Sequence, residues 1–252
     1  MSYQAHVTDT AYHYDGSYAG FLCCIFESFA RREIPAAVCP PQEGQITLFG
    51  IRRAQRVARG LQRLGPEVRD RVATGFLAAA PGKDLRLLRF ARLCFDRGPG
   101  AARMLGDADA AAAFALERAV TSEAHRYVEF LRFEERDGML GAVIHPKHFV
   151  LPLLRGHFCS RLPDEDFLIF DATHGTALLR RSGQVQYLAM ERYAPGPDEA
   201  EESWQAQWKR FFRALTIEER RNERAQATHV FKRFWPDMCE MQPEAPAGGA
   251  HS

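Results

Sequence analysis

The sequence predicts an α+β protein that is mostly helical, with a small antiparallel β-sheet in its middle third, at about residues 131–190. Residues 51–130 place apolar side chains three and four positions apart, which is typical of amphipathic helices. After residue 131 the pattern changes to short apolar runs separated by turn residues, as in strands and hairpins. Helices precede strands and follow them again without βαβ alternation, which indicates the α+β class.

The N-terminal part of the chain predicts a helical region with few strands. A short strand, an Asp-Gly turn and a helix capped by Ser17 are expected in residues 11–30, and the Pro/Gly-rich segment 32–50 is expected to be irregular. Four further helices are predicted: one at about 51–64, one that starts at Gly65-Pro66, one at 83–97 and one at about 107–130, the last opened by Asp107 or Asp109.

The following segments predict the sheet and a basic C-terminal region. A hairpin turns at Asp137-Gly138, a short helix stops before Pro163, and three strands turn at His174-Gly175 and Ser182-Gly183. We expect one domain over residues 1–240, followed by a disordered tail at 241–252. Its parts are a helical region at 17–130, a sheet region at 131–190 and basic helices at 202–235.

Composition excludes several protein classes. No apolar run approaches 18 residues and no secretory signal precedes the first helix, so we expect a cytoplasmic protein without a membrane span. The six cysteines are scattered and form no C-x-x-C pair, which argues against a zinc ribbon or an iron–sulfur site. We therefore predict no metal and no cofactor.

Charge is unevenly distributed along the chain. Residues 51–103 contain thirteen Lys/Arg against four Asp/Glu, and residues 203–235 contain eight against three. Clustered positive charge suits a polyanion partner, although solvated helix faces in an Arg-rich chain explain the same numbers. The candidate nucleic-acid contacts are Arg52, Arg56, Arg59, Arg126, Arg132, Arg161, Arg220, Arg221, Asn222, Arg224, Lys232 and Arg233.

Acidic and imidazole side chains supply the catalytic candidates Glu123, His125, His157 and Asp171. Glu123 falls in the apolar seam of its helix, so its carboxylate either forms a buried ion pair, with Arg126, or lines a cleft as a titrating acid. His125 can pair with Glu129 one helical turn later. A hydrolytic metal site built on His145, His148 and Asp171 is the weaker alternative.

Five motifs, in this order, resemble a bacterial family of probable DNA metabolism proteins, the domain of unknown function 4130. They are YDGSYAGFL, EAHRYVEFLRFEE, HPKHFVLPLLRGHFCSRLPDEDFLIFD, the stretch from Trp208 to Gln226, and a terminal RFW. The resemblance spans Tyr12 to Trp235 and departs from the family at Phe234, where a Tyr is expected. It implies a link to DNA repair or modification, to a radical-SAM protein and to uracil-DNA-glycosylase-like domains.

Three functions therefore stay open at the level of the sequence. The first is a DNA-binding accessory of a radical-SAM protein, with phosphates held by the basic helices 51–63, 83–97 and 217–235. The second is an enzyme acting on nucleic acid or nucleotide through the Glu/His/Asp candidates. The third is an adaptor that docks the radical-SAM protein through the aromatic helix 203–215 and makes no nucleic-acid contact itself.

Overall fold

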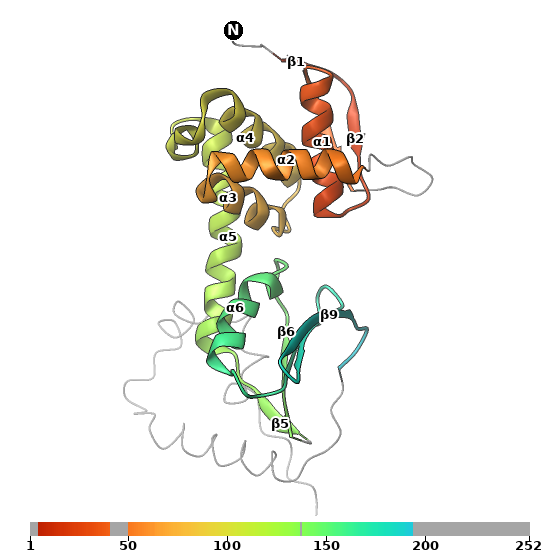
Figure 1. Cartoon of the computed structure of the whole chain (residues 1–252), viewed down its shortest axis with the longest axis vertical. Helices are drawn as coiled ribbons and strands as arrows, with labels where there is room; N and C mark the ends of the chain where they lie inside the picture. The colour runs from red at the N-terminus through yellow and green to blue at the C-terminus, as the bar shows by residue number, and fades with distance from the viewer. Residues whose placement is uncertain (1–4, 41–49, 137, 194–252) are drawn as a thin grey trace, which may run out of the picture. The chain divides into compact units, whose positions relative to one another are not determined.

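The computed structural model describes residues 5–40, 50–136 and 138–193, and its contacts divide the chain into two compact units, Met1–Ser122 and Glu123–Ser252 (Figure 1). Helix α5 contains the boundary between them. The predicted C-terminal helices and tail lie outside the described residues. The single-domain organisation stays a prediction, and each unit is described by itself.

The first unit is built from helices. Its elements are α1 (Tyr18–Ala30), α2 (Ile51–Leu64), α3 (Pro66–Phe76), α4 (Lys83–Arg97), the 3-10 helix η1 (Pro99–Arg103) and the first part of α5 (Ala108–Phe130). Ser17 caps α1 as predicted, because its hydroxyl accepts a hydrogen bond of 2.9 Å from the Gly20 N–H. Asp107 caps α5 through the N–H groups of Asp109 and Ala110.

Four very short strands flank α1. Strand β1 (His6–Val7) pairs in parallel with β3 (Glu33–Ile34), and β2 (Ala11–His13) pairs in parallel with β4 (Ala37–Cys39). The expectation that segment 32–50 is irregular is therefore wrong for β3 and β4. Runs of two or three residues are too short to show the alternation that reveals a strand in a sequence.

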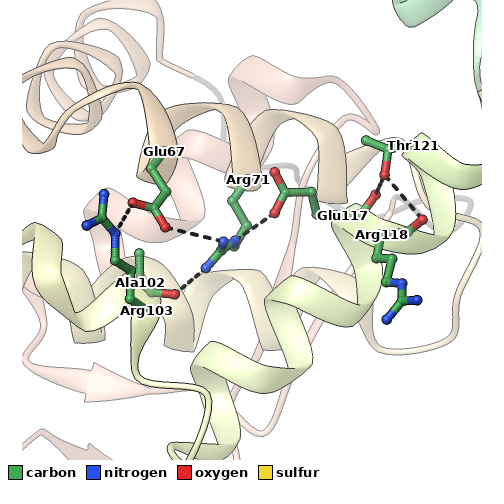
Figure 2. A network of polar contacts seen from close by, with 7 residues as sticks. All are labelled: Glu67, Arg71, Ala102, Arg103, Glu117, Arg118 and Thr121. Carbon is green, nitrogen blue, oxygen red and sulfur yellow. Dashed lines mark hydrogen bonds and ion pairs between the residues drawn. The ribbon is translucent and has the colours of Figure 1, made fainter.

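A buried arginine joins three elements of the first unit (Figure 2). Arg71 of α3 is 6% exposed, and its Nε donates to a Glu117 carboxylate oxygen of α5 at 2.7 Å. The same guanidinium donates to the Ala102 carbonyl of η1 and lies 3.6 Å from the Glu67 carboxylate. Its charge is thus paired and hydrogen-bonded inside the helical core, as burial of an ion requires.

The second unit contains a five-stranded sheet in the order β5-β6-β7-β8-β9, with α6 (Leu151–Arg161) between β6 and β7 in the chain. The strands are β5 (Glu134–Arg136), β6 (Met139–Ile144), β7 (Phe167–Asp171), β8 (Thr176–Arg181) and β9 (Gln184–Ala189). Every residue of β7 is buried, including the terminal Asp171, and the apolar run at 167–170 is typical of a strand covered on both faces. The turns predicted at 174–175 and 182–183 are confirmed by left-handed backbone at Gly175, Ser182 and Gly183.

The α+β class is confirmed, with one correction to the sheet. Strands β6 and β7 run parallel, so the sheet is mixed rather than wholly antiparallel. The segment that contains α6 carries the chain back to the end of the sheet at which β6 begins, so that β7 can run in the same direction beside it. Among the described residues, no helix is both long and apolar enough to cross a membrane.

Candidate functional site

The outer side of α2 carries a row of arginines. Ala54, Val57 and Leu61 bury the opposite side of the helix. The exposed row, called the arginine face below, consists of Arg52, Arg56, Arg59 and Arg63, which together with Gln55 line a hollow of about 610 Å³. Within residues 5–40, 50–136 and 138–193, no carboxylate forms an ion pair with any of these four guanidinium groups. Their positive charge is therefore directed to solvent.

An aromatic groove adjoins the arginine face. It has a volume of about 500 Å³, is lined by Phe26 and Phe29 of α1, Gly60 of α2 and Phe95 of α4, and shares Arg56 and Arg63 with the arginine face. The Arg56 guanidinium carbon lies 5.8 Å from the Phe26 ring centroid, within cation–π range. Sequence reasoning missed this groove, because its rings come from two helices separated by the whole of α2 and α3.

Helix α4 presents only part of the basic surface predicted for 83–97 to solvent, since Arg86 and Arg97 are exposed. Arg92 is 6% exposed, donates to the Ser28 hydroxyl at 2.7 Å and lies over the Phe29 ring. Lys83 donates to the Phe76 carbonyl and lies over the Phe76 ring. Lys83 and Arg92 therefore pack against aromatic rings, and only the other basic side chains of α4 are open to solvent.

Glu123 is buried and bound by backbone groups. Its side chain accepts hydrogen bonds from the N–H of Lys147 at 3.1 Å and from the N–H of His148 at 2.7 Å, and the residue is 2% exposed. The prediction that this carboxylate sits in the apolar seam is confirmed. These bonds anchor α5 to the loop before α6, which is a structural use of the carboxylate.

The two candidate histidines lie in different surroundings. The side chain of His125 is 70% exposed, and its Nε2 lies 3.2 Å from Glu129, which confirms the predicted pair one turn apart. His157 on α6 packs its ring against Phe158, with 4.9 Å between the centroids. Its Nε2 is buried and has no hydrogen-bond partner among the described residues.

Asp171, the last residue of β7, holds a turn together. One of its oxygens accepts from the N–H groups of Thr173 and His174, both at 3.0 Å, and the other lies 2.7 Å from His174 Nδ1. Burial raises the pKa of the Asp171 carboxyl above its ordinary value, while the hydrogen bonds from His174 and Thr173 act in the opposite direction. His174 was not predicted as the partner of Asp171, although its spacing of three after an aspartate in a turn is a usable signal.

The loop that contains Lys147 and His148, called the Glu123-binding loop below, follows the carboxyl end of β6. Asp171 lies at the carboxyl end of β7, the parallel neighbour of β6. Ala172 N–H donates to the Ile144 carbonyl, and Phe149 contacts the His174 ring at 5.5 Å between centroids. Within the described residues, no three His, Cys, Asp or Glu side chains are grouped as a metal site requires, so His145, His148 and Asp171 form none. The predicted acids act here as anchors of a loop and a turn.

The remaining candidates divide between surface and undescribed positions. In the second unit Arg126 is half-buried, whereas Arg132 and Arg161 are exposed. The C-terminal candidates and the aromatic helix proposed for an adaptor lie outside the described residues: Arg220, Arg221, Asn222, Arg224, Lys232, Arg233 and segment 203–215.

Comparison with known proteins gives one family. No match was found among curated proteins or among solved structures. A family model described as a domain of unknown function (DUF4130) matches residues 81–240, more than half of the chain. The matched segment includes α4, the sheet and Glu123, whereas α2 precedes it. The chain belongs to the DUF4130 family.

Proposed function

We propose that this protein binds DNA through the arginine face of α2 and acts in DNA repair or modification. The observation that carries the proposal is a row of four arginines on one exposed side of a single helix, none of which forms an ion pair with another described residue. Such a row neutralises phosphates and releases their counterions, which supplies much of the affinity of DNA-binding proteins. Guanidinium groups also grip phosphate oxygens through two parallel hydrogen bonds.

The length of the row suits a nucleic-acid backbone. Arg52 and Arg63 lie eleven positions apart on α2, which is roughly 16 Å along the axis at about 1.5 Å per residue. A DNA strand advances about 3.4 Å per phosphate, so several consecutive phosphates fit beside the face. The side chains of these arginines line a common hollow of about 610 Å³, so they lie beside one another along the helix.

The partner part of the proposal is a radical-SAM protein, with a uracil-DNA-glycosylase-like domain as a second associate. Its support is the resemblance of the motifs to the family of probable DNA metabolism proteins. Co-expression with a radical-SAM protein encoded beside the gene tests it. We expect the two proteins to purify together after nuclease treatment, and separation under that treatment would contradict a direct partnership.

The DNA-binding part is tested by fluorescence anisotropy with a labelled oligonucleotide at about 50 mM and about 200 mM salt. We expect affinity to fall steeply with salt, and Arg52→Gln/Arg59→Gln to weaken binding about tenfold at the lower salt. Removal of two phosphate contacts also reduces the slope of log affinity against log salt by roughly 2. Both positions lie outside the aromatic groove and are solvent-exposed, so stability should change by less than about 0.5 kcal/mol.

The matched control removes the same charge elsewhere. Arg118 of α5 and Arg181 of β8 are exposed, and Arg118→Gln/Arg181→Gln should keep most of the affinity at both salt concentrations. Equal losses in the two double variants would show that only net charge matters. That result, or absence of binding to any DNA at about 50 mM salt, would overturn the proposal.

A further inference from the structure

The aromatic groove beside the arginine face is large enough for a small organic group. Its volume of about 500 Å³ lies within the range of about 300–1,000 Å³ typical of small-molecule sites. Three phenylalanines line it, and the Phe29 and Phe95 rings meet edge to face with 5.5 Å between their centroids. The groove therefore offers flat apolar surfaces to a flat apolar ligand.

Cations surround these rings. The guanidinium carbons of Arg53 and Arg56 lie 5.7 and 5.8 Å from the centroid of the Phe26 ring, and that of Arg92 lies 4.3 Å from the Phe29 centroid. Arg56 and Arg63 belong to both the groove and the arginine face, so the two hollows adjoin at these side chains. A ligand that fills both must combine a flat ring with a neighbouring anionic group.

Gly60 of α2 leaves space for the Phe95 ring in the wall of the groove. A Cβ at this position would lie 2.7 Å from the nearest atom of the Phe95 ring, closer than real contacts allow. Glycine in the middle of a helix costs about 1 kcal/mol relative to alanine. The absence of a side chain therefore lets the Phe95 ring lie against α2 in the wall of the groove.

We infer that the aromatic groove holds an unpaired nucleobase of a single-stranded DNA whose phosphates lie along the arginine face. The inference rests on the proposed function and adds the class of nucleic acid. Aromatic rings beside cations bind single strands by stacking bases while the cations neutralise phosphates. A base within a duplex is stacked on its neighbours and cannot enter such a groove unless it is turned out of the helix.

Three labelled DNA probes of equal length test the inference: an oligothymidine strand, the same strand with abasic residues in place of the thymidines, and a duplex. We expect the oligothymidine to bind about tenfold more tightly than the abasic strand, because stacking contributes on the order of 1–3 kcal/mol per base. Phe26→Leu keeps apolar volume but removes a stacking face, and should reduce that ratio to about one to two. The affinity for the abasic strand should stay unchanged.

Gly60→Ala provides a second variant whose helix propensity is favourable, so α2 is expected to stay folded. Its added methyl group displaces the Phe95 ring and should lower the same ratio. Tyr187→Leu on β9, an aromatic residue 41% exposed in the second unit, is the control and should leave the ratio unchanged. Arg52→Gln/Arg59→Gln should weaken all three probes by similar factors.

The outcomes separate this inference from the proposed function. Equal binding of the oligothymidine and abasic strands, with a steep salt dependence for both, would overturn the base site and leave the arginine face intact. A Gly60→Ala protein that stays folded and keeps the full ratio would also overturn it. Absence of binding to all three probes would overturn both.

Discussion

The arginine face of α2 and the two buried acids Glu123 and Asp171 use charge in opposite ways. On α2, four guanidinium groups face solvent and form no ion pair within the described part of the chain. Glu123 of α5 and Asp171 at the end of β7 are buried and accept hydrogen bonds from backbone N–H groups. Charge left open to solvent is available to a ligand, whereas charge satisfied by the chain's own backbone holds the fold.

Arg71 sharpens the contrast within the first unit. It has the same side chain as the arginine face, but it is buried against Glu117 and the Ala102 carbonyl and lies over the Phe90 and Phe114 rings. The comparison predicts that substitutions of the arginine face change binding and leave stability intact. Substitutions of the buried charges should lower stability and leave binding intact.

The largest effect on stability is expected at Arg71. Arg71→Met keeps the apolar stem but leaves Glu117 and a buried carbonyl without the guanidinium, so we expect a loss of about 3 kcal/mol in the free energy of unfolding. Urea denaturation measures it. Arg103→Met is the control, since Arg103 contacts the shared partner Glu67 with a side chain that is 80% exposed, and should cost less than about 1 kcal/mol.

A loss similar to that of Arg103→Met would mean that burial does not distinguish the two arginines. DNA affinity of folded Arg71→Met should match that of the unsubstituted protein. A selective loss of affinity in Arg71→Met would contradict the claim that exposed arginines bind DNA whereas buried, paired ones stabilise the fold.

Glu123→Gln is expected to have the next largest effect. Its amide group places an N–H donor where a carboxylate oxygen accepted one from the backbone, so we expect a loss of about 2 kcal/mol from an unsatisfied buried group. Thermal or urea unfolding measures this loss, with the exposed Glu129→Gln as the control. Unchanged stability together with lost function would instead assign Glu123 to chemistry.

The smallest effect is expected from Asp84, a buried carboxylate near the start of α4. It is 4% exposed, and one oxygen has no hydrogen-bond partner among the described residues. Burial raises the pKa of this carboxyl above its ordinary value, against the opposing influence of Lys83 and Tyr14. The folded protein therefore binds the proton more tightly than the unfolded chain does.

That difference sets the direction of a pH dependence. The contribution of Asp84 to stability falls as pH rises from the ordinary pKa of about 3.8 through the raised folded value. Asp84→Asn cannot ionise, so its stability relative to the unsubstituted protein should increase across that window. Urea titrations at several pH values measure the change, and Asp70→Asn, whose side chain is 54% exposed, should show a much smaller one. A constant difference between Asp84→Asn and the unsubstituted protein would contradict the prediction.

Local features of this protein follow from its amino-acid sequence alone. The phase of α2 follows from apolar and basic residues spaced three and four apart, and the cap at Ser17 and the turn at Gly175 follow from side-chain chemistry within a few residues. The seam position of Glu123 is of the same kind, because helical spacing alone marks an acid among apolar neighbours.

Contacts between residues far apart in the sequence could not be predicted and are known from the packing of the fold. The partners of Glu123 are 24 and 25 positions away in a loop, and the groove joins Phe26 to Phe95 across three helices. The parallel pairing of β6 and β7, which brings the Glu123-binding loop and the Asp171 turn to one edge, depends on the course of α6. A sequence pattern records local periodicity, whereas contacts between separate elements depend on how these elements pack.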